Sequence, residues 1–149
     1  MGMTLKSPKR KGAILEDFVA DRLVETGLDP RAKRDGASGA GTREKGDVST
    51  AVAINGRNLG IECKNHKNVA IPEWWKQTKK LEEIGREPIL VFKMNREPLE
   101  GSLVCIYFET LLELLSGNAE ELKSITEKPE IQYKAKRAKE AINDLIKVL

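Results

Sequence analysis

Residues 46–65 read GDVSTAVAINGRNLGIECKN, and this stretch decides the fold. Two runs rich in Val, Ile, Leu and Ala lie on either side of Asn55-Gly56. Asn-Gly is the dipeptide that most easily adopts the positive φ angles of a two-residue type I′ turn. The stretch therefore predicts a β-hairpin that turns at Asn55-Gly56.

A two-residue turn also predicts which residues face each other across the hairpin. Because side chains alternate between the faces of a strand, one face pairs Asp47 with Lys64 and Ser49 with Glu62. Facing Cβ atoms lie about 4.5–5.5 Å apart, so this register would bring the three charged residues together. The other, nearly continuous apolar face would pair Ile54 with Arg57, Val52 with Leu59, Thr50 with Ile61 and Val48 with Cys63.

The charged face has a plain alternative explanation, which is an exposed sheet surface of mixed charge without a function. Glu-x-Lys alone is uninformative, since it recurs at residues 121–123 in a stretch that reads as helix. The small residues Ser49, Ala51 and Gly60 instead indicate that another element approaches the charged face. We expect that element to be the edge of the helix at 11–26.

The composition suits one soluble domain. The chain has 149 residues, of which 40% are hydrophobic and 33% charged, enough to bury a single core. No stretch is long and apolar enough to span a membrane, and the start MGMTLKSPKRKG lacks the apolar segment of a secretory signal. We therefore expect a cytoplasmic protein with no membrane contact. Cys63 and Cys105 are expected to be buried free thiols rather than a disulfide or a zinc site.

The remaining pattern alternates helices and strands. The amphipathic helix at 11–26 has an apolar stripe that includes Leu15 and Phe18, and it ends at Gly27. Other expected elements are a short strand at 31–34, a Gly-rich loop at 36–41, a helix at 72–85 opened by Pro72, strands at 88–94 and 103–108, a short helix at 110–115, a helix capped by Asn118, and a helix at 132–149.

This order of helix, acidic strand start, Glu-x-Lys strand and basic helix resembles the core of the PD-(D/E)xK nucleases. The segment RKGAILE at 10–16 is similar to the start of the archaeal-type Holliday junction resolvases. The resemblance covers residues 9–93 and implies an α/β fold with a restriction-endonuclease-like core, in which helices flank a mixed central sheet. Gly46 stands where the superfamily's name has proline, and the loop before Asp47 is long and Gly-rich.

The resemblance also implies how the chain is divided. We expect a single nuclease domain over residues 1–149, with a basic N-terminal arm at 1–11 and a C-terminal helix at 130–149. The net charge is only +3, but basic residues cluster in that arm and again at 76–80. Local basic patches of this kind indicate a polyanionic partner.

Carried over position by position, the resemblance implies a metal site. Glu16, Asp47 and Glu62 would be acidic ligands, the backbone carbonyl of Cys63 a further ligand, and Lys64 the catalytic lysine. Mg²⁺ prefers oxygen ligands and retained waters, and Mn²⁺ is expected to substitute for it. A bound cation neutralises charge on the phosphate and lowers the pKa of water. A lysine beside carboxylates stays protonated and can orient hydroxide or stabilise the phosphate, and a role as a base is left open.

Basic and polar residues around this pattern are candidates for DNA contact. In the resolvases the Arg-Lys-Gly segment touches DNA, and related nucleases often place a Gln or Lys where Gln77 lies. The Gly-rich loop either closes over a phosphate backbone or is a plain mobile loop, and His66 either sits near a phosphate or faces solvent. The predicted DNA-binding set is Lys9, Arg10, Lys11, Ser38, Arg43, Lys45, Lys76, Gln77 and Lys79.

Together these observations predict a metal-dependent DNA endonuclease. The first expectation is a Holliday junction resolvase acting as a homodimer, because paired cuts in a four-way junction need two symmetric sites. The alternative is another PD-(D/E)xK structure-specific repair or phage nuclease that cuts flaps, single strands or duplex. A non-catalytic DNA-binding module is disfavoured, because the whole set of acidic residues and lysine is present.

Overall fold

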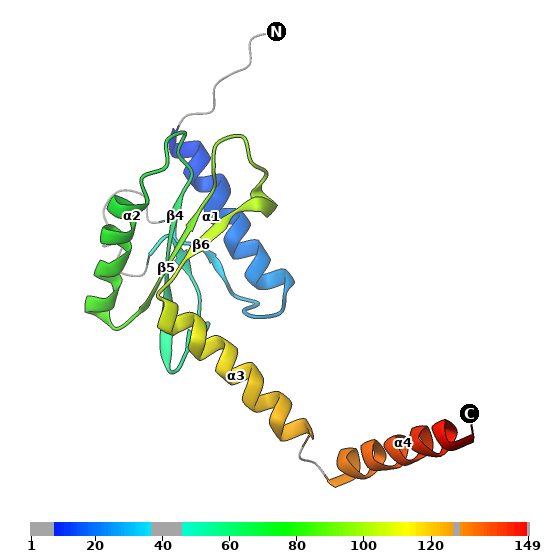
Figure 1. The fold of residues 1–149 in the computed structure, drawn as a ribbon. Helices are drawn as coiled ribbons and strands as arrows, with labels where there is room; N and C mark the ends of the chain where they lie inside the picture. The colour runs from blue at the N-terminus through cyan, green and yellow to red at the C-terminus, as the bar shows by residue number, and fades with distance from the viewer. Residues whose placement is uncertain (1–7, 37–45, 127–128, 149) are drawn as a thin grey trace. The chain divides into compact units, whose positions relative to one another are not determined.

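The protein is built on a mixed β-sheet with helices on both faces, as Figure 1 shows. The structure is a computed structural model, and it describes residues 8–36, 46–126 and 129–148. The chain divides into two compact units, residues 1–107 and 108–149. The sheet belongs to the first unit, and this arrangement confirms the α/β fold class that the sequence predicts.

The first unit contains α1 (Pro8–Glu25), β1 (Lys33–Arg34), β2 (Val48–Ser49), β3 (Ala53–Ile54), β4 (Arg57–Lys64), α2 (Ile71–Thr78), the 3₁₀ helix η1 (Lys79–Ile84), β5 (Glu87–Phe92), the 3₁₀ helix η2 (Leu99–Gly101) and β6 (Leu103–Cys105). The strand order is β1-β2-β4-β5-β6, and β3 pairs with β4 outside this path. Among the described strands, β4 and β5 form the one parallel pair. A parallel pair needs a crossover connection, which α2 and η1 supply.

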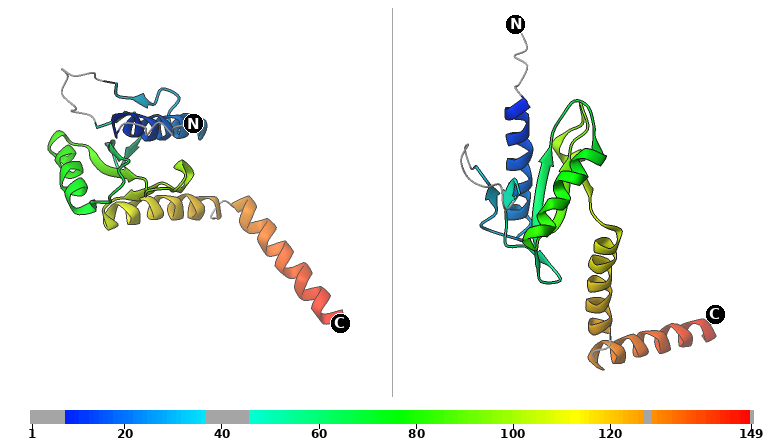
Figure 2. Two further views of the ribbon diagram at one scale, coloured as in Figure 1. Left: turned by 90° about the horizontal axis from the view of Figure 1, so that it is seen from above. Right: turned by 90° about the vertical axis from the view of Figure 1, so that its left-hand side faces the viewer.

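Helix α1 packs on the apolar face of the sheet, on the side away from the viewer in Figure 1 (Figure 2). Its Leu15 and Ala20 are buried, and Phe18 packs against the same cluster. This confirms the predicted apolar stripe of the helix. The strand residues of the cluster are Val48, Leu59, Ile61, Cys63, Ile89 and Val91, so the apolar face of the predicted hairpin is the main core of the protein.

Helix α2 and η1 cover the opposite face. Trp74 packs there with Leu90 and Phe92 of β5. A Cβ atom added to Gly60 would lie 2.9 Å from Leu81 Cδ1, so the glycine allows η1 to approach β4. The small residues of the charged face do admit another element, but the expectation that this element is the first helix is wrong. The apolar stripe of α1 can only be buried against the apolar face.

The hairpin turns where the sequence predicts, but its register changes further along. Asn55 and Gly56 have φ angles of 48° and 77°, and Ile54 pairs with Arg57 as expected. Val48 then pairs with Ile61, whereas the predicted partner is Cys63. Two extra residues on the β2–β3 side form a bulge, and a shift by two keeps each side chain on its predicted face.

A buried carboxylate holds this bulge in place. Asp29 Oδ2 accepts hydrogen bonds from the Thr50 hydroxyl, at 2.7 Å, and from the Ala51 N–H, at 2.8 Å. Its Oδ1 accepts from the Arg31 N–H, at 2.9 Å. The Ala51 N–H therefore bonds to Asp29 in place of a ladder bond to β4.

The second unit consists of α3 (Phe108–Thr126) and α4 (Pro129–Val148). The sequence predicts separate helices at 110–115 and from Asn118, but α3 runs through both without a break. The predicted strand at 103–108 is shorter, because α3 begins at Phe108. Among the residues that the structure describes, no helix is long and apolar enough to cross a membrane.

Candidate active site

Asp47 is fixed to β4 by its main chain and by its side chain. Its N–H donates to the Ile61 carbonyl at 2.7 Å, and its Oδ2 accepts from the Cys63 N–H at 2.8 Å. The predicted register instead pairs Asp47 with Lys64, and it is wrong because of the two-residue bulge. The carboxylate of Asp47 thus lies against the peptide that joins Glu62 to Cys63.

Gly46 makes this arrangement possible. Its φ angle is +85°, and a Cβ atom at this position would lie 2.5 Å from the Ile61 carbonyl oxygen. Proline fixes φ near −65° and adds side-chain atoms, so it satisfies neither condition. The structure therefore gives a physical reason for glycine where the superfamily's name has proline.

Glu62 and Lys64 come from the same strand, on the face covered by α2. Glu62 is buried, with 5% of its surface exposed, and Lys64 is half-buried. Lys64 Nζ donates a hydrogen bond to Gln77 Oε1 of α2 at 2.8 Å. Gln77, predicted from its place in the helix after Glu-x-Lys, thus contacts the candidate catalytic lysine directly.

The Cys63 thiol responds to the charges gathered around it. Burial raises the pKa of Cys63 well above its usual range, the carboxylates of Asp47, Glu16 and Glu62 raise that pKa further, and Lys64 lowers it. All four predicted catalytic residues therefore contribute to the electrostatic surroundings of the Cys63 thiol. Glu16 belongs to α1, where its Oε1 lies 3.8 Å from the position of a Cβ added to Gly12, one turn earlier in the same helix.

The donor chemistry of this cluster suits a hard cation. Carboxylate and carbonyl oxygens are the ligands that Mg²⁺ and similar ions prefer, and Asp47, Glu62 and the Cys63 carbonyl are of this kind. In the described part of the chain no three His, Cys, Asp or Glu groups are gathered closely enough to hold an ion together. A cation bound by these residues would therefore keep several water ligands, as Mg²⁺ commonly does.

The predicted DNA-binding residues fall in several places. Lys9 and Arg10 are exposed, and Lys11 is half-buried. All three lie in the first turns of α1, so the end of the predicted arm at 1–11 is helical. Exposed positions on α2 and η1 hold Lys76 and Lys79, respectively. The predicted contacts Ser38, Arg43 and Lys45 lie outside the described residues.

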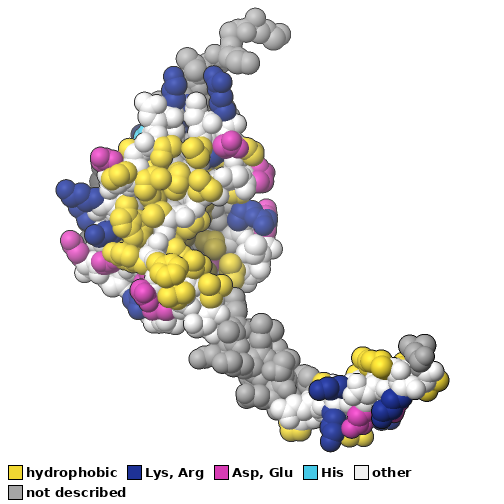
Figure 3. All heavy atoms as spheres, in the orientation of Figure 1, with side chains coloured by type: hydrophobic (Ala, Val, Ile, Leu, Met, Phe, Trp, Pro, Cys, Tyr) yellow, Lys and Arg dark blue, Asp and Glu magenta, His cyan; other side chains and the backbone are white. Residues whose placement is uncertain are grey.

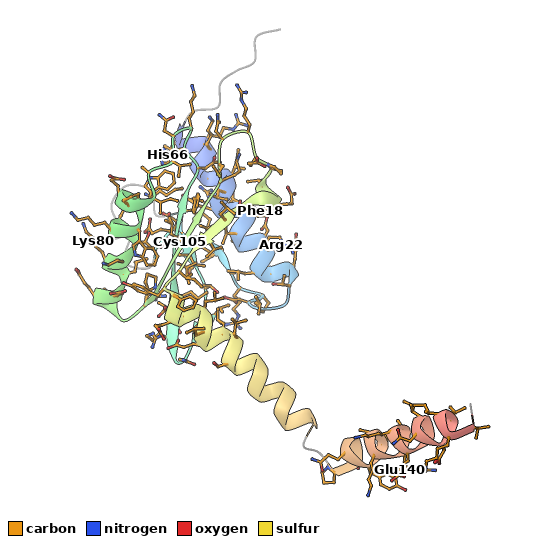
Figure 4. The ribbon with its side chains drawn as sticks, viewed as in Figure 1. Phe18, Arg22, His66, Lys80, Cys105 and Glu140 are labelled. Atoms are coloured by element: carbon orange, nitrogen blue, oxygen red, sulfur yellow. The ribbon has the colours of Figure 1, made fainter. Side chains whose placement is uncertain are left out.

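The structure also places polar residues that the sequence prediction omits at the ends of β4 and β5. Asn65 and Lys67 follow β4 directly, and Lys93 follows the parallel strand β5. Figure 4 shows neighbouring His66 at the same end of the sheet, near the start of α1. The run KNHKN at 64–68 could have predicted these residues from the sequence, since ligands of α/β proteins commonly bind at the carboxyl ends of parallel strands.

Comparisons with known proteins address the family. A model of the family described as phage putative PDDEXK endonuclease matches residues 7–148. No curated protein matches the chain. No solved structure matches it either.

Proposed function

The chain belongs to the phage putative PDDEXK endonuclease family, and on this premise we propose that it is a divalent-metal-dependent DNA endonuclease. The observation that carries the proposal is the hydrogen bond between Asp47 and the Cys63 N–H. This bond joins the first acidic residue of the motif to the strand that bears Glu62 and Lys64. Nucleases of this superfamily generally use divalent ions, and the cluster offers oxygen donors that suit them.

The mechanism assigns a role to each residue. Asp47, Glu62 and the Cys63 carbonyl would hold the cation, and Glu16 would add a carboxylate from α1 through bound water. When bound, a divalent cation supplies neutralisation of phosphate charge and a water of lowered pKa. Lys64, oriented by Gln77, would donate to the phosphate oxygens as negative charge builds on them.

For the substrate we propose a four-way DNA junction, cut by a homodimer. The similarity of residues 10–16 to archaeal-type resolvases supports this substrate, and C₂ symmetry would supply two sites for paired cuts. The first unit also carries a large apolar surface on the side away from α1, where Figure 3 shows hydrophobic side chains gathered. Two exposed residues belong to this side, since Leu103 pairs with Phe92 and Tyr107 packs against Trp75, and large exposed apolar surfaces mark contacts between proteins.

The family description favours a second candidate, a phage nuclease that cuts flaps, single strands or duplex. A cleavage panel separates the two. The protein should cut one of four substrates (junction, flap, duplex or single strand) with Mg²⁺ or Mn²⁺, and EDTA should stop the reaction. Preference for the junction supports the resolvase, and preference for another substrate supports the second candidate. Absence of cleavage on all four with either metal would contradict the nuclease proposal.

Variants connect cleavage to the cluster. Asp47→Asn, Glu62→Gln and Glu16→Gln should each lower the cleavage rate by roughly a hundredfold or more, the scale expected when one group that stabilises the transition state is removed. DNA binding should persist, because less negative charge faces the phosphates. Asp17→Asn is the matched control, since Asp17 is exposed and pairs with Arg34 at 3.0 Å. Equal activity of the cluster variants and this control would contradict the site.

A further inference from the structure

A hollow lies beside the candidate active site, at the carboxyl ends of β4 and β5, and charged and amide side chains line it together with the apolar Ile14, Pro98 and Leu99. It has a volume of about 320 Å³, at the lower end of the range for ligand sites and large enough for a phosphate group with part of its nucleotide. A second hollow of about 310 Å³ shares four of its residues. The residues of the first hollow that matter most here are Lys11, Asn65, His66, Lys67, Lys93 and Asn95.

The lining of the first hollow suits an anion. Three lysines contribute positive charge and Glu97 contributes one negative charge, which leaves an excess of two positive charges from these four residues. Lys11 also lies near the N-terminus of α1, where the helix dipole favours negative charge. Asn65 and Asn95 add amide groups that can donate to phosphate oxygens.

The walls of the hollow are held by hydrogen bonds. Asn65 Nδ2 donates to the Lys11 carbonyl at 2.9 Å, and this bond ties the end of β4 to α1. The Lys93 N–H donates to the Lys64 carbonyl at 3.1 Å. His66 packs against Trp74, with ring centroids 5.6 Å apart. The lining is therefore already arranged before a ligand binds, which lowers the entropic cost of binding.

The hollow continues directly from the catalytic lysine. Asn65 follows Lys64 in sequence, and Lys67 is three residues beyond it. With a rise of about 3.3 Å per residue in extended chain, Lys67 lies within roughly 10 Å of Lys64 along the backbone. Each DNA strand carries one phosphate per about 3.4 Å of helix axis. The hollow is therefore at the distance of a phosphate a few nucleotides from the one that is cut.

We propose that this hollow binds an internal phosphate of the substrate DNA strand and so fixes where along the strand the cut falls. The inference rests on the proposed nuclease function, and its ligand is the phosphodiester group rather than a base. A terminal 5′-phosphate has similar chemistry, but the hollow is open to solvent, so a strand could continue past it on either side. The experiment below distinguishes the two sources.

The test measures binding, so that it does not depend on cleavage. In the Asp47→Asn background, dissociation constants are measured for the four panel substrates, each with a single neutral methylphosphonate at successive positions. A methylphosphonate at one position should weaken binding by about tenfold to a hundredfold, which is the size of one charge-assisted hydrogen bond. Lys67→Gln should remove the sensitivity at that position alone, and Lys67→Arg should retain it. The slope of log affinity against log salt should also fall by roughly 0.9 for duplex in Lys67→Gln.

The control is Lys33→Gln, which removes the same charge from an exposed lysine of β1. It should leave the sensitive position unchanged. The inference would be overturned if the methylphosphonate still weakened binding at that position in Lys67→Gln. It would also be overturned if Lys33→Gln removed the effect equally. A Lys67-dependent preference for 5′-phosphorylated over 5′-hydroxyl ends would overturn the assignment to an internal phosphate. Coupling between Lys67 and one phosphate without any cleavage by the parental chain would support the hollow and contradict the nuclease proposal.

Discussion

At the scale of single residues, the site depends on side chains whose partners hold them in one position. Lys64 is an example. Its side chain is long and flexible, and the hydrogen bond from its ammonium group to the side-chain oxygen of Gln77 holds it in place. Gln77 is exposed and has no share in the apolar core. Its contribution is therefore to position Lys64 rather than to stabilise the fold.

Replacing Gln77 tests this role. Gln77→Leu should lower kcat by about tenfold to a hundredfold and leave KM little changed. A loss of this size is typical when the residue that orients a metal ligand is removed. Gln77→Glu should restore most of the rate, because its carboxylate can still accept from Lys64 Nζ. Steady-state kinetics on the preferred substrate, with melting temperatures for both variants, provide the measurement. A change in KM alone would mean that Gln77 contacts DNA instead.

At the scale of elements, Asp29 connects the loop after α1 to the bulge between β2 and β3. The Thr50 hydroxyl, then the Ala51 and Arg31 N–H groups, lower the pKa of Asp29 from its ordinary value of 3.8. The folded state therefore favours the carboxylate. Its contribution to stability is complete above the unfolded pKa and is lost as pH falls through the lower folded pKa.

Asp29→Asn should thus lower the melting temperature at neutral pH. Its amide NH₂ would face the Thr50 hydroxyl and the Ala51 N–H, which donate to Asp29 Oδ2 in the parent. The difference between parent and variant should shrink below about pH 3.8. Thermal unfolding from pH 7 downward measures both effects. Asp21→Asn, an exposed change on α1, is the control and should melt like the parent at pH 7. A parent–variant difference that stays constant at all pH values would contradict this role of Asp29.

The same region shows what the sequence can and cannot predict. The turn at Asn55-Gly56 and the buried face of the hairpin depend on neighbouring residues, and both are confirmed. The change of register depends on Asp29, which bonds to Thr50 across 21 residues, so local pairing rules do not reveal it. The Asn118 cap signal is likewise overridden within the continuous helix α3.

The sequence identifies the residues of the candidate site but not the contacts between them. The motif identifies Asp47, Glu62 and Lys64, and their shared environment around Cys63 agrees with it. The partner of Lys64 is Gln77 rather than Asp47, because the bulge moves Asp47 to the Cys63 N–H. The hollow next to Lys64 needs β4 and β5 to be parallel, and only the tertiary fold establishes that.

At the scale of the whole molecule, the proposed homodimer should depend on the apolar surface away from α1. Leu103, in the edge strand β6, is 45% exposed. Burying a leucine contributes about 1.5–3 kcal/mol, so Leu103→Lys should raise the dimer dissociation constant by at least about tenfold. Sedimentation velocity over a concentration series measures this. The control is Leu28→Lys, because Leu28 is 64% exposed in the loop after α1. A parental chain that sediments only as a monomer would contradict the dimer.

The close contact between residue 46 and the Ile61 carbonyl has a consequence for the gene. Every glycine codon begins with GG, and any change of either base that still encodes an amino acid introduces a residue with a Cβ atom. Each such residue would meet the Ile61 backbone within 2.5 Å and would have to adopt a φ of +85°, which L-residues strongly disfavour. In natural DNA sequences, codon 46 should therefore show silent substitutions at its third base and almost no others.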